Sequence, residues 1–381
     1  MNAPTGWGEA ARVLAAGFAQ RAAAHDRDGS FPHENFAELH AAGLLVLAAP
    51  RALGGQGASM AQLAEVVGAI GHGCPATALV LTMQYVQQRG MGRPGSPWPE
   101  ALARRLVREA VDGVSLINAL RVEPELGSPA RGGLPATVAR QTPEGWRLSG
   151  RKIYSTGAPI LRWYAVWART DEAAPRVGTF LVRADSPGVR VEPTWDHLGL
   201  RASGSHDVVL HDVPTPLDHA LGLQPAGARP QADGAFQAEM TLLLGALYTG
   251  VARAARDWLL QFLRERAPSS LGAPLATLAR AQEAVGRIEA LLLSSRRLLA
   301  GLAQDVDAGT PVGAVDGGLL KAVVMRNAVD AVQEALALTS NHGLSRRNPL
   351  ERHLRDVLCG RVHTPQDDSV HVAAGRAALN L

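Results

Sequence analysis

GWRLSGRKIYSTGAP, residues Gly145–Pro159, and the WYAVWART that follows at Trp163–Thr170 decide the fold of this 381-residue chain. Both runs are short, contain Val, Tyr or Trp, and are bounded by turn residues such as Gly and Pro, which is the pattern of strands joined by turns. GTFLVRA, GVRVEP and DVVLHDV continue the same pattern. We therefore predict a sheet between residues 113 and 222, folded as a barrel or a sandwich.

Helical patterns flank this sheet on both sides. ENFAELHAAGLL (Glu34–Leu45) and AQLAEVVGAI (Ala61–Ile70) repeat apolar residues at spacings of three and four, and a similar periodicity runs from Met240 onward. Because strands and helices are segregated along the chain, the predicted fold class is α+β and not a doubly wound sheet of βαβ units. The predicted domains are an N-terminal helical domain (1–112), a middle β domain (113–222) and a C-terminal four-helix bundle (223–381), with the polar segment LQPAGARPQADG from residue 223 as the connection.

Composition excludes several classes of partner. Lys plus Arg total 38 against 35 for Asp plus Glu, with no run of five like charges, so we expect no nucleic acid. Cys74 and Cys359 belong to no CxxC motif, which predicts no metal centre, no disulfide and a cytoplasmic location. The uncharged run Val66–Gln88 is interrupted by GHGCP, so we expect two buried helices and no membrane span. Gly71 and Gly73 follow a helical pattern instead of a strand, so we interpret them as a helix break and not as a dinucleotide motif.

Five segments of the chain resemble, in order, landmarks of the acyl-CoA dehydrogenase superfamily of flavoproteins. They are the glycine turn PRALGGQGAS, the loop VEPELGS, the hairpin GWRLSGRKIYSTGAP, the turn DHLGLRASGSHDVVLHDVPTP and the helix start PLERHLRDV. The resemblance implies an oxidoreductase that holds a flavin, FAD in preference to FMN, between the β domain and the bundle. It also implies a homo-oligomer, a tetramer in preference to a dimer, because the adenine half of the FAD reaches into a neighbouring subunit.

The resemblance assigns a first group of flavin contacts to the hairpin and to the loop before it. Tyr154 stands where the family has an aromatic residue against the flavin ring, and Thr156 where it has a hydroxyl toward N5, with Ser155 between them. Fixed donors suit the ring because it gains negative charge on reduction. In the loop, Ser128 matches the family's pattern, whereas Val122 replaces a threonine, so that a backbone N–H would serve instead. Apart from the resemblance, ordinary strand and turn roles explain these residues.

A second group is implied for the diphosphate and the adenosine. Arg266 and Gln282, on either side of LGAPL, resemble an Arg and a Gln that reach the FAD of a partner subunit, although the spacing after Arg266 is longer than usual. Asn341 and Gly343 resemble an interhelical turn, where a missing side chain lets the backbone approach a phosphate.

The catalytic position departs from the family. An acyl-CoA dehydrogenase removes an α-proton with a glutamate, and the matching residue is Thr364, which cannot act as a base. Losing a general base ordinarily costs about 10² to 10⁴ in rate. Glu239 is one residue, about 100°, out of register with an alternative base of the family, and we interpret it as a helix-start residue that complements the dipole. His363, beside Thr364, is a candidate catalytic donor or base, since histidine titrates near neutral pH; the alternative is a structural histidine.

These departures favour the oxygen-using branch of the superfamily. The predicted function is a flavin-dependent monooxygenase of an aromatic, heteroaromatic or thioester substrate. The alternatives are an acyl-CoA dehydrogenase with a relocated base, Glu239 or Asp367, and a flavin-free binding protein. The substrate is a small molecule, CoA-linked or free, and the electrons come either from a flavin reductase or from the substrate itself.

Overall fold

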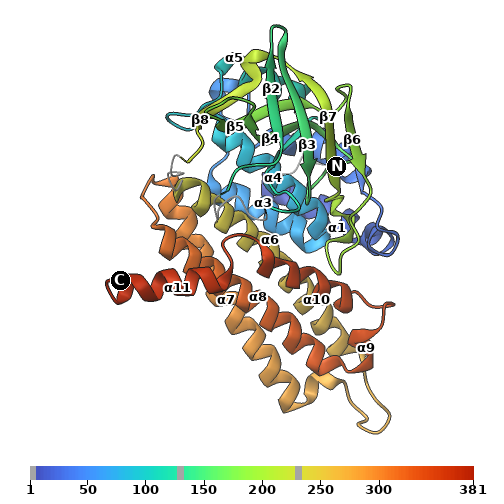
Figure 1. The fold of residues 1–381 in the computed structure, drawn as a ribbon. Helices are drawn as coiled ribbons and strands as arrows, with labels where there is room; N and C mark the ends of the chain where they lie inside the picture. The colour runs from blue at the N-terminus through green and yellow to red at the C-terminus, as the bar shows by residue number, and fades with distance from the viewer. Residues whose placement is uncertain (1–5, 127–132, 228–233) are drawn as a thin grey trace.

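The computed structural model describes residues 6–126, 133–227 and 234–381. Its three zones are stacked along the long axis of the molecule (Figure 1). The strands gather at one end, the N-terminal helices lie beneath and beside the sheet, and long helices form the other end. Strands and helices are therefore segregated, and the predicted α+β fold class is confirmed.

The N-terminal zone is entirely helical apart from its turns. Its helices are α1 (Trp7–Asp28), α2 (His33–Ala41), α3 (Met60–Gly73), α4 (Pro75–Met91) and α5 (Glu100–Asp112), with two 3₁₀ turns at Leu44–Val46 and Arg51–Leu53. α3 begins with a capping box, in which the side chains of Ser59 and Gln62 each accept the backbone N–H of the other residue. Pro75 opens α4, where the missing N–H costs nothing. The prediction of two buried helices is confirmed, because both are largely buried.

Gly71 and Gly73 are explained by packing rather than by a helix break. Both lie inside α3, which ends at Gly73, and the break falls at Cys74. A Cβ on Gly71 would lie 2.7 Å from the carbonyl oxygen of Leu247 in α6, and one on Gly73 would lie 2.2 Å from that of Ala15 in α1. The two glycines therefore let α1 and α6 cross α3 closely. The predicted break within GHGCP is confirmed, but it falls at Cys74 and not at the glycines themselves.

The described strands form one mixed sheet of eight. In sequence order they are β1 (Leu116–Leu120), β2 (Val138–Thr142), β3 (Gly145–Lys152), β4 (Leu161–Thr170), β5 (Arg176–Arg183), β6 (Val189–Glu192), β7 (Asp207–Thr215) and β8 (Ala220–Pro225). The hydrogen-bonded order is β6-β7-β3-β2-β4-β5-β8, and β1 pairs with β4 in parallel. β8 continues to Pro225, so the start of the segment that we assigned to a connection belongs to the sheet.

The C-terminal zone consists of three long helices and shorter ones against them. They are α6 (Gly234–Glu265), α7 (Ala279–Asp307), α8 (Ala314–Thr339), α9 (Asn341–Leu344), α10 (Leu350–Leu358) and α11 (Asp367–Ala378). α10 lies along α6 and α8, as Figure 1 shows, which completes a bundle of four. Asp307, at the end of α7, accepts the N–H groups of Met60 and Ala61 and so ties the bundle to the start of α3. Across the described ranges, no helix is both long enough and apolar enough to cross a membrane.

Candidate functional site

The turn that follows β3 has an unusual backbone at the predicted flavin position. Tyr154 has a φ of 56°, in the left-handed region that a tyrosine rarely occupies, and the residue is 53% exposed. Such outliers persist only where the surroundings enforce them and are frequent at functional sites. Ser155 is buried, and its hydroxyl has no hydrogen-bond partner within the described residues. A buried hydroxyl without a partner is a donor available to a ligand.

Hydroxyl groups continue from Thr156 into the neighbouring turn, residues 200–206. Thr156 Oγ1 lies 3.0 Å from Ser205 Oγ, which lies 2.7 Å from Ser203 Oγ. The N–H of Ser155 donates to the carbonyl of His206, at 3.0 Å, and locks the two turns together. This set of uncharged donors fits the needs of a flavin ring, which accepts hydrogen bonds at N5 and at its pyrimidine edge.

The loop that contains Val122 is held beside this turn by a buried ion pair. The carbonyl of Val122 accepts the N–H of Ile153, at 3.0 Å, so Val122 lies next to the Tyr154 turn, as the resemblance implies. Glu123 accepts from Lys152 Nζ at 2.6 Å and from both the N–H and the hydroxyl of Thr137. Burial lowers the pKa of Lys152 to about 8. Ser128, the other predicted residue of this loop, lies outside the described residues.

Aromatic rings flank Tyr154 in an arrangement that we did not predict. Trp195 and His197 stack face to face, with ring centroids 3.6 Å apart. Tyr154 meets both rings edge-on, at 6.3 and 5.8 Å. Trp195 Nε1 donates to the carbonyl of Leu200, which fixes its ring on the second turn. The sequence carried a weak signal, since Trp195 and His197 flank Asp196 at the start of a segment that resembles the family.

A buried carboxyl attaches the second turn to the bundle. Asp356, in α10, accepts the N–H of Leu200 at 2.7 Å, and burial raises the pKa of its carboxyl to about 6. The neighbouring Arg355 binds both carboxylate oxygens of Asp26 and the carbonyl of Leu198. α10 is therefore anchored to the same turn that contacts Thr156.

His363 is engaged with the bundle through a tyrosine. Its Nε2 lies 2.7 Å from the hydroxyl of Tyr248 in α6. Burial, together with the nearby Lys321 ammonium, lowers the pKa of His363 to about 4. Lys321 in turn donates to the carbonyl of Pro365, at 2.7 Å. Thr364, which lies between His363 and Pro365 in the chain, is exposed. His363 is therefore neutral at physiological pH, and residue 364 offers no carboxylate.

The two alternative carboxylates are also bound to cations. Glu239 forms ion pairs with Arg89, at 3.1 Å, and with Arg93, both close to the end of α4. It is the sixth residue of the described part of α6, so our interpretation of Glu239 as a first-turn residue is wrong. Asp367, at the start of α11, lies 3.6 Å from Lys321 Nζ. Neither group is a free base.

The second predicted group lies at the opposite end of the bundle from the sheet (Figure 1). Arg266, Gln282 and Asn341 are exposed, and Gln282 donates to the carbonyl of Ala276. Gly343 is buried, and a Cβ there would lie 2.2 Å from Thr339 Oγ1, so packing within the chain already requires a glycine. One chain does not bring this group to the Tyr154 turn.

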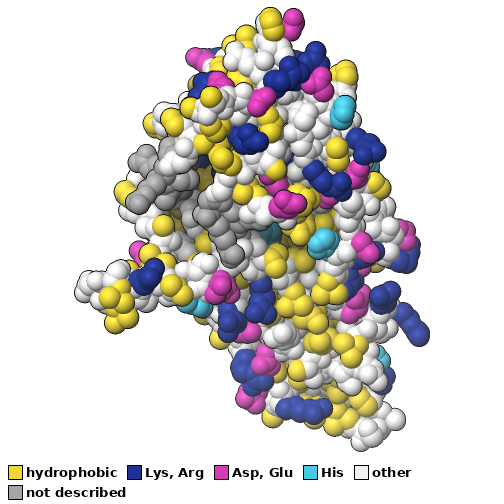
Figure 2. Space-filling model, viewed as in Figure 1, with side chains coloured by type: hydrophobic (Ala, Val, Ile, Leu, Met, Phe, Trp, Pro, Cys, Tyr) yellow, Lys and Arg dark blue, Asp and Glu magenta, His cyan; other side chains and the backbone are white. Residues whose placement is uncertain are grey.

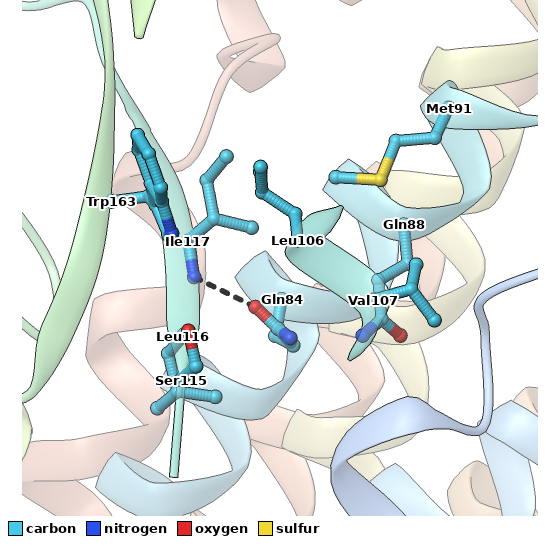
Figure 3. Close-up of a pocket in the computed structure, with 9 residues that line it drawn as sticks. All are labelled: Gln84, Gln88, Met91, Leu106, Val107, Ser115, Leu116, Ile117 and Trp163. Atoms are coloured by element: carbon cyan, nitrogen blue, oxygen red, sulfur yellow. Dashed lines mark hydrogen bonds between the residues drawn. The ribbon is translucent and has the colours of Figure 1, made fainter. Parts of the chain in front are cut away.

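A small cavity elsewhere in the molecule is not a substrate site. It lies between α4, α5 and β1, and Figure 3 shows Gln84 reaching the backbone of Ile117 across it. Its volume of about 10 Å³ has room for at most one water molecule. Within the described ranges, no cluster of three or more His, Cys, Asp or Glu residues could hold a metal ion.

Family models match all three zones of the chain. The N-terminal, middle and C-terminal domains of acyl-CoA dehydrogenases match residues 8–93, 121–213 and 242–367. Among curated proteins, the Bacillus subtilis (strain 168) protein YdbM, named as an acyl-CoA dehydrogenase, is 34% identical and the match covers 97% of this chain and 96% of that protein. L-evernosamine nitrososynthase of a Micromonospora species is 30% identical, with 93% and 86% covered.

A solved structure shows the same architecture with a flavin bound. It is KijD3 in complex with FMN and dTDP-3-amino-2,3,6-trideoxy-4-keto-3-methyl-D-glucose. The TM-score is 0.82 at 30% identity, and the match covers all of this chain and 95% of that chain. The architecture described above is thus found in a protein that binds a flavin together with a nucleotide-linked amino sugar.

Proposed function

The chain belongs to the acyl-CoA dehydrogenase family of flavin-dependent oxidoreductases, and within it we propose a flavin-dependent monooxygenase rather than a dehydrogenase. The observation that carries the proposal is that no carboxylate stands at residue 364, the position that the resemblance assigns to the base. Residue 364 is a threonine, and the carboxylates of Glu239 and Asp367 lie against cations. Oxygen transfer removes no α-proton from a thioester, so it does not need this base.

A bound flavin would supply the two-electron chemistry and the activation of O₂. One oxygen atom enters the substrate and the other leaves as water, with two electrons from a reductant such as a flavin reductase and two protons. The first group of residues, Tyr154, Ser155 and Thr156 with Val122, would hold the ring through backbone and hydroxyl donors. His363, neutral and beside the missing base, would donate a hydrogen bond to the substrate or to the oxygen.

Two features of the assembly belong to this proposal. Arg266, Gln282 and Asn341 would complete an FAD site on a second copy of the chain, since one chain leaves them exposed and distant from Tyr154. The oligomer, a tetramer in preference to a dimer, would also cover apolar side chains of the bundle. Figure 2 shows apolar side chains gathered on the bundle. Among the residues of its helices, Leu293, Val323 and Leu344 are at least 45% exposed. FAD is preferred to FMN, because only FAD has an adenosine for Arg266, Gln282 and Asn341 to bind.

The substrate is a small molecule that accepts oxygen. We propose an aromatic, heteroaromatic or thioester compound, and the names of the relatives add an amino sugar to these classes. Amines and electron-rich aromatic or heteroaromatic rings share a nucleophilic atom for the oxygen to join. A CoA moiety is not required.

An anaerobic titration separates the monooxygenase from the dehydrogenase. The flavin-loaded protein is mixed with butyryl-CoA and then with longer acyl-CoA thioesters, and the visible flavin band is followed. We expect no bleaching, whereas NADH with a flavin reductase should reduce the flavin, and O₂ uptake should start once air is admitted. Bleaching by a thioester, with formation of an enoyl-CoA, would defeat the proposal in favour of an acyl-CoA dehydrogenase. Failure to retain either FAD or FMN would leave only a binding protein.

A further inference from the structure

The contact between His363 and Tyr248 joins two segments 115 residues apart. Tyr248 lies in the middle of α6 and is fully buried, and its ring is covered by Gly360, where a Cβ would lie 3.2 Å away. His363 is only half-buried. The phenol of Tyr248 therefore lies in the interior, whereas the imidazole of His363 can contact a ligand.

The direction of this hydrogen bond follows from burial. If His363 donated to the phenol oxygen, the hydroxyl hydrogen of Tyr248 would need another acceptor, and none is found within the described ranges. A buried polar hydrogen without an acceptor is rare in folded proteins. The phenol therefore donates, and Nε2 of His363 accepts. A neutral imidazole that accepts at Nε2 carries its hydrogen on Nδ1.

We propose that Tyr248 is a positioning residue that holds His363 as the Nδ1–H tautomer, so that the ring donates a hydrogen bond at the site and does not act as a base. The role of the donated bond rests on the proposed monooxygenase function. Tyr248 itself touches neither substrate nor flavin in this proposal. It acts through His363 alone.

The groups around the pair support a fixed neutral imidazole. From α8, the Lys321 ammonium disfavours a second positive charge on His363, and it is fixed on the carbonyl of Pro365. Burial raises the pKa of the Tyr248 phenol well above its ordinary value, and Cys359 and Asp356, at the end of α10, raise it further. From α11, Asp367 faces Lys321 rather than His363. The phenol thus stays protonated and can always donate.

Solid-state ¹⁵N spectra of the flavin-loaded protein, labelled at histidine, test the tautomer directly. The chain has 12 histidines, so the His363 signals are assigned by their loss in His363→Gln. We expect an unprotonated Nε2 and a protonated Nδ1 in the native protein, and a shift toward the Nε2–H form in Tyr248→Phe. Tyr85→Phe is the matched control, because Tyr85 is equally buried but donates to the carbonyl of Leu44. A protonated Nε2 in the native protein, or an unchanged tautomer in Tyr248→Phe, would overturn the proposal.

A second readout tests the consequence of the tautomer. Tyr248→Phe should retain its flavin but release hydrogen peroxide, with a loss of oxygenated product of about tenfold or more, since a wrong histidine tautomer can cost up to about 10⁴ in rate. His363→Gln should lose as much product as Tyr248→Phe, and the double variant should lose no more than either single variant. A tautomer shift with unchanged product would overturn the positioning role. Bleaching by acyl-CoA would instead defeat the monooxygenase function and leave the tautomer result standing.

Discussion

The two groups of predicted flavin residues differ in how much of a site one chain supplies. Around Tyr154, the backbone is strained, Ser155 is buried with a free hydroxyl, and an ion pair fixes the adjoining loop. Around Arg266, the side chains are exposed and far from the ring site. The difference fits our proposal that one chain forms the ring site and that a second copy completes the adenosine end. FMN would use only the first region, and FAD would use both.

The largest expected effect comes from breaking the ion pair that supports the first region. Lys152→Met should lower the free energy of unfolding by about 3–5 kcal/mol, because it leaves Glu123 ionised and buried without its cation. Urea unfolding measures the change, and binding of FAD and of FMN should weaken together. Arg140→Met, which breaks the exposed pair with Asp212 in the same sheet, is the control and should cost less than about 1 kcal/mol. Equal costs for the two variants would contradict the supporting role of the buried pair.

A smaller, pH-dependent effect should come from the carboxyl that joins the first region to α10. Burial raises the pKa of Asp356 from 3.8 to about 6, so the folded state favours the protonated form. Its contribution to stability is full below about pH 4 and is lost as the pH rises through about 6. At about 1.4 kcal/mol for each pH unit, the native protein should lose about 3 kcal/mol relative to Asp356→Asn between pH 4 and 7.

Urea unfolding of the native protein and of Asp356→Asn at several pH values measures the gap between their free energies of unfolding. The asparagine oxygen can still accept the N–H of Leu200, so the variant isolates the charge. Asp212→Asn, at an exposed carboxyl, should show no such trend and serves as the control. A gap that does not change with pH would show that Asp356 is ionised in the folded protein throughout.

The smallest effect should come from the second region. Arg266→Ala combined with Gln282→Ala should weaken FAD binding about tenfold, or about 1.4 kcal/mol, and leave FMN binding unchanged. Titration of the flavin-free protein with each flavin measures both constants, and the neighbouring exposed Arg264→Ala is the control. Unchanged FAD binding would show that Arg266 and Gln282 do not contact the cofactor. The argument that a partner chain completes the FAD site would then fail.

By itself, the sequence determined the α+β order, the paired buried helices and the strand-rich middle zone, whereas the assignment of Thr364 to the position of the base depends on the resemblance and stays a prediction. These features depend on periodicity and on turn or capping residues such as Ser59 and Pro75, which act within a few positions of the chain. Tyr154 and Thr156 could be singled out only because their hairpin resembles a known family. The placement of Ser128 and the exact domain boundaries stay predictions.

Only the tertiary structure decided which distant groups meet. Lys152 and Lys321 are the two lysines of the chain, and both are buried. The scarcity of lysine is visible in the sequence, but only the fold shows that Glu123 and the carbonyl of Pro365 accept hydrogen bonds from these two ammonium groups. Glu239 likewise forms ion pairs with arginines near the end of α4, which are far from it in the sequence. The cost of burying a charge or a polar hydrogen depends on all the elements packed around it, so such pairs follow from the packing of the fold and not from any local pattern.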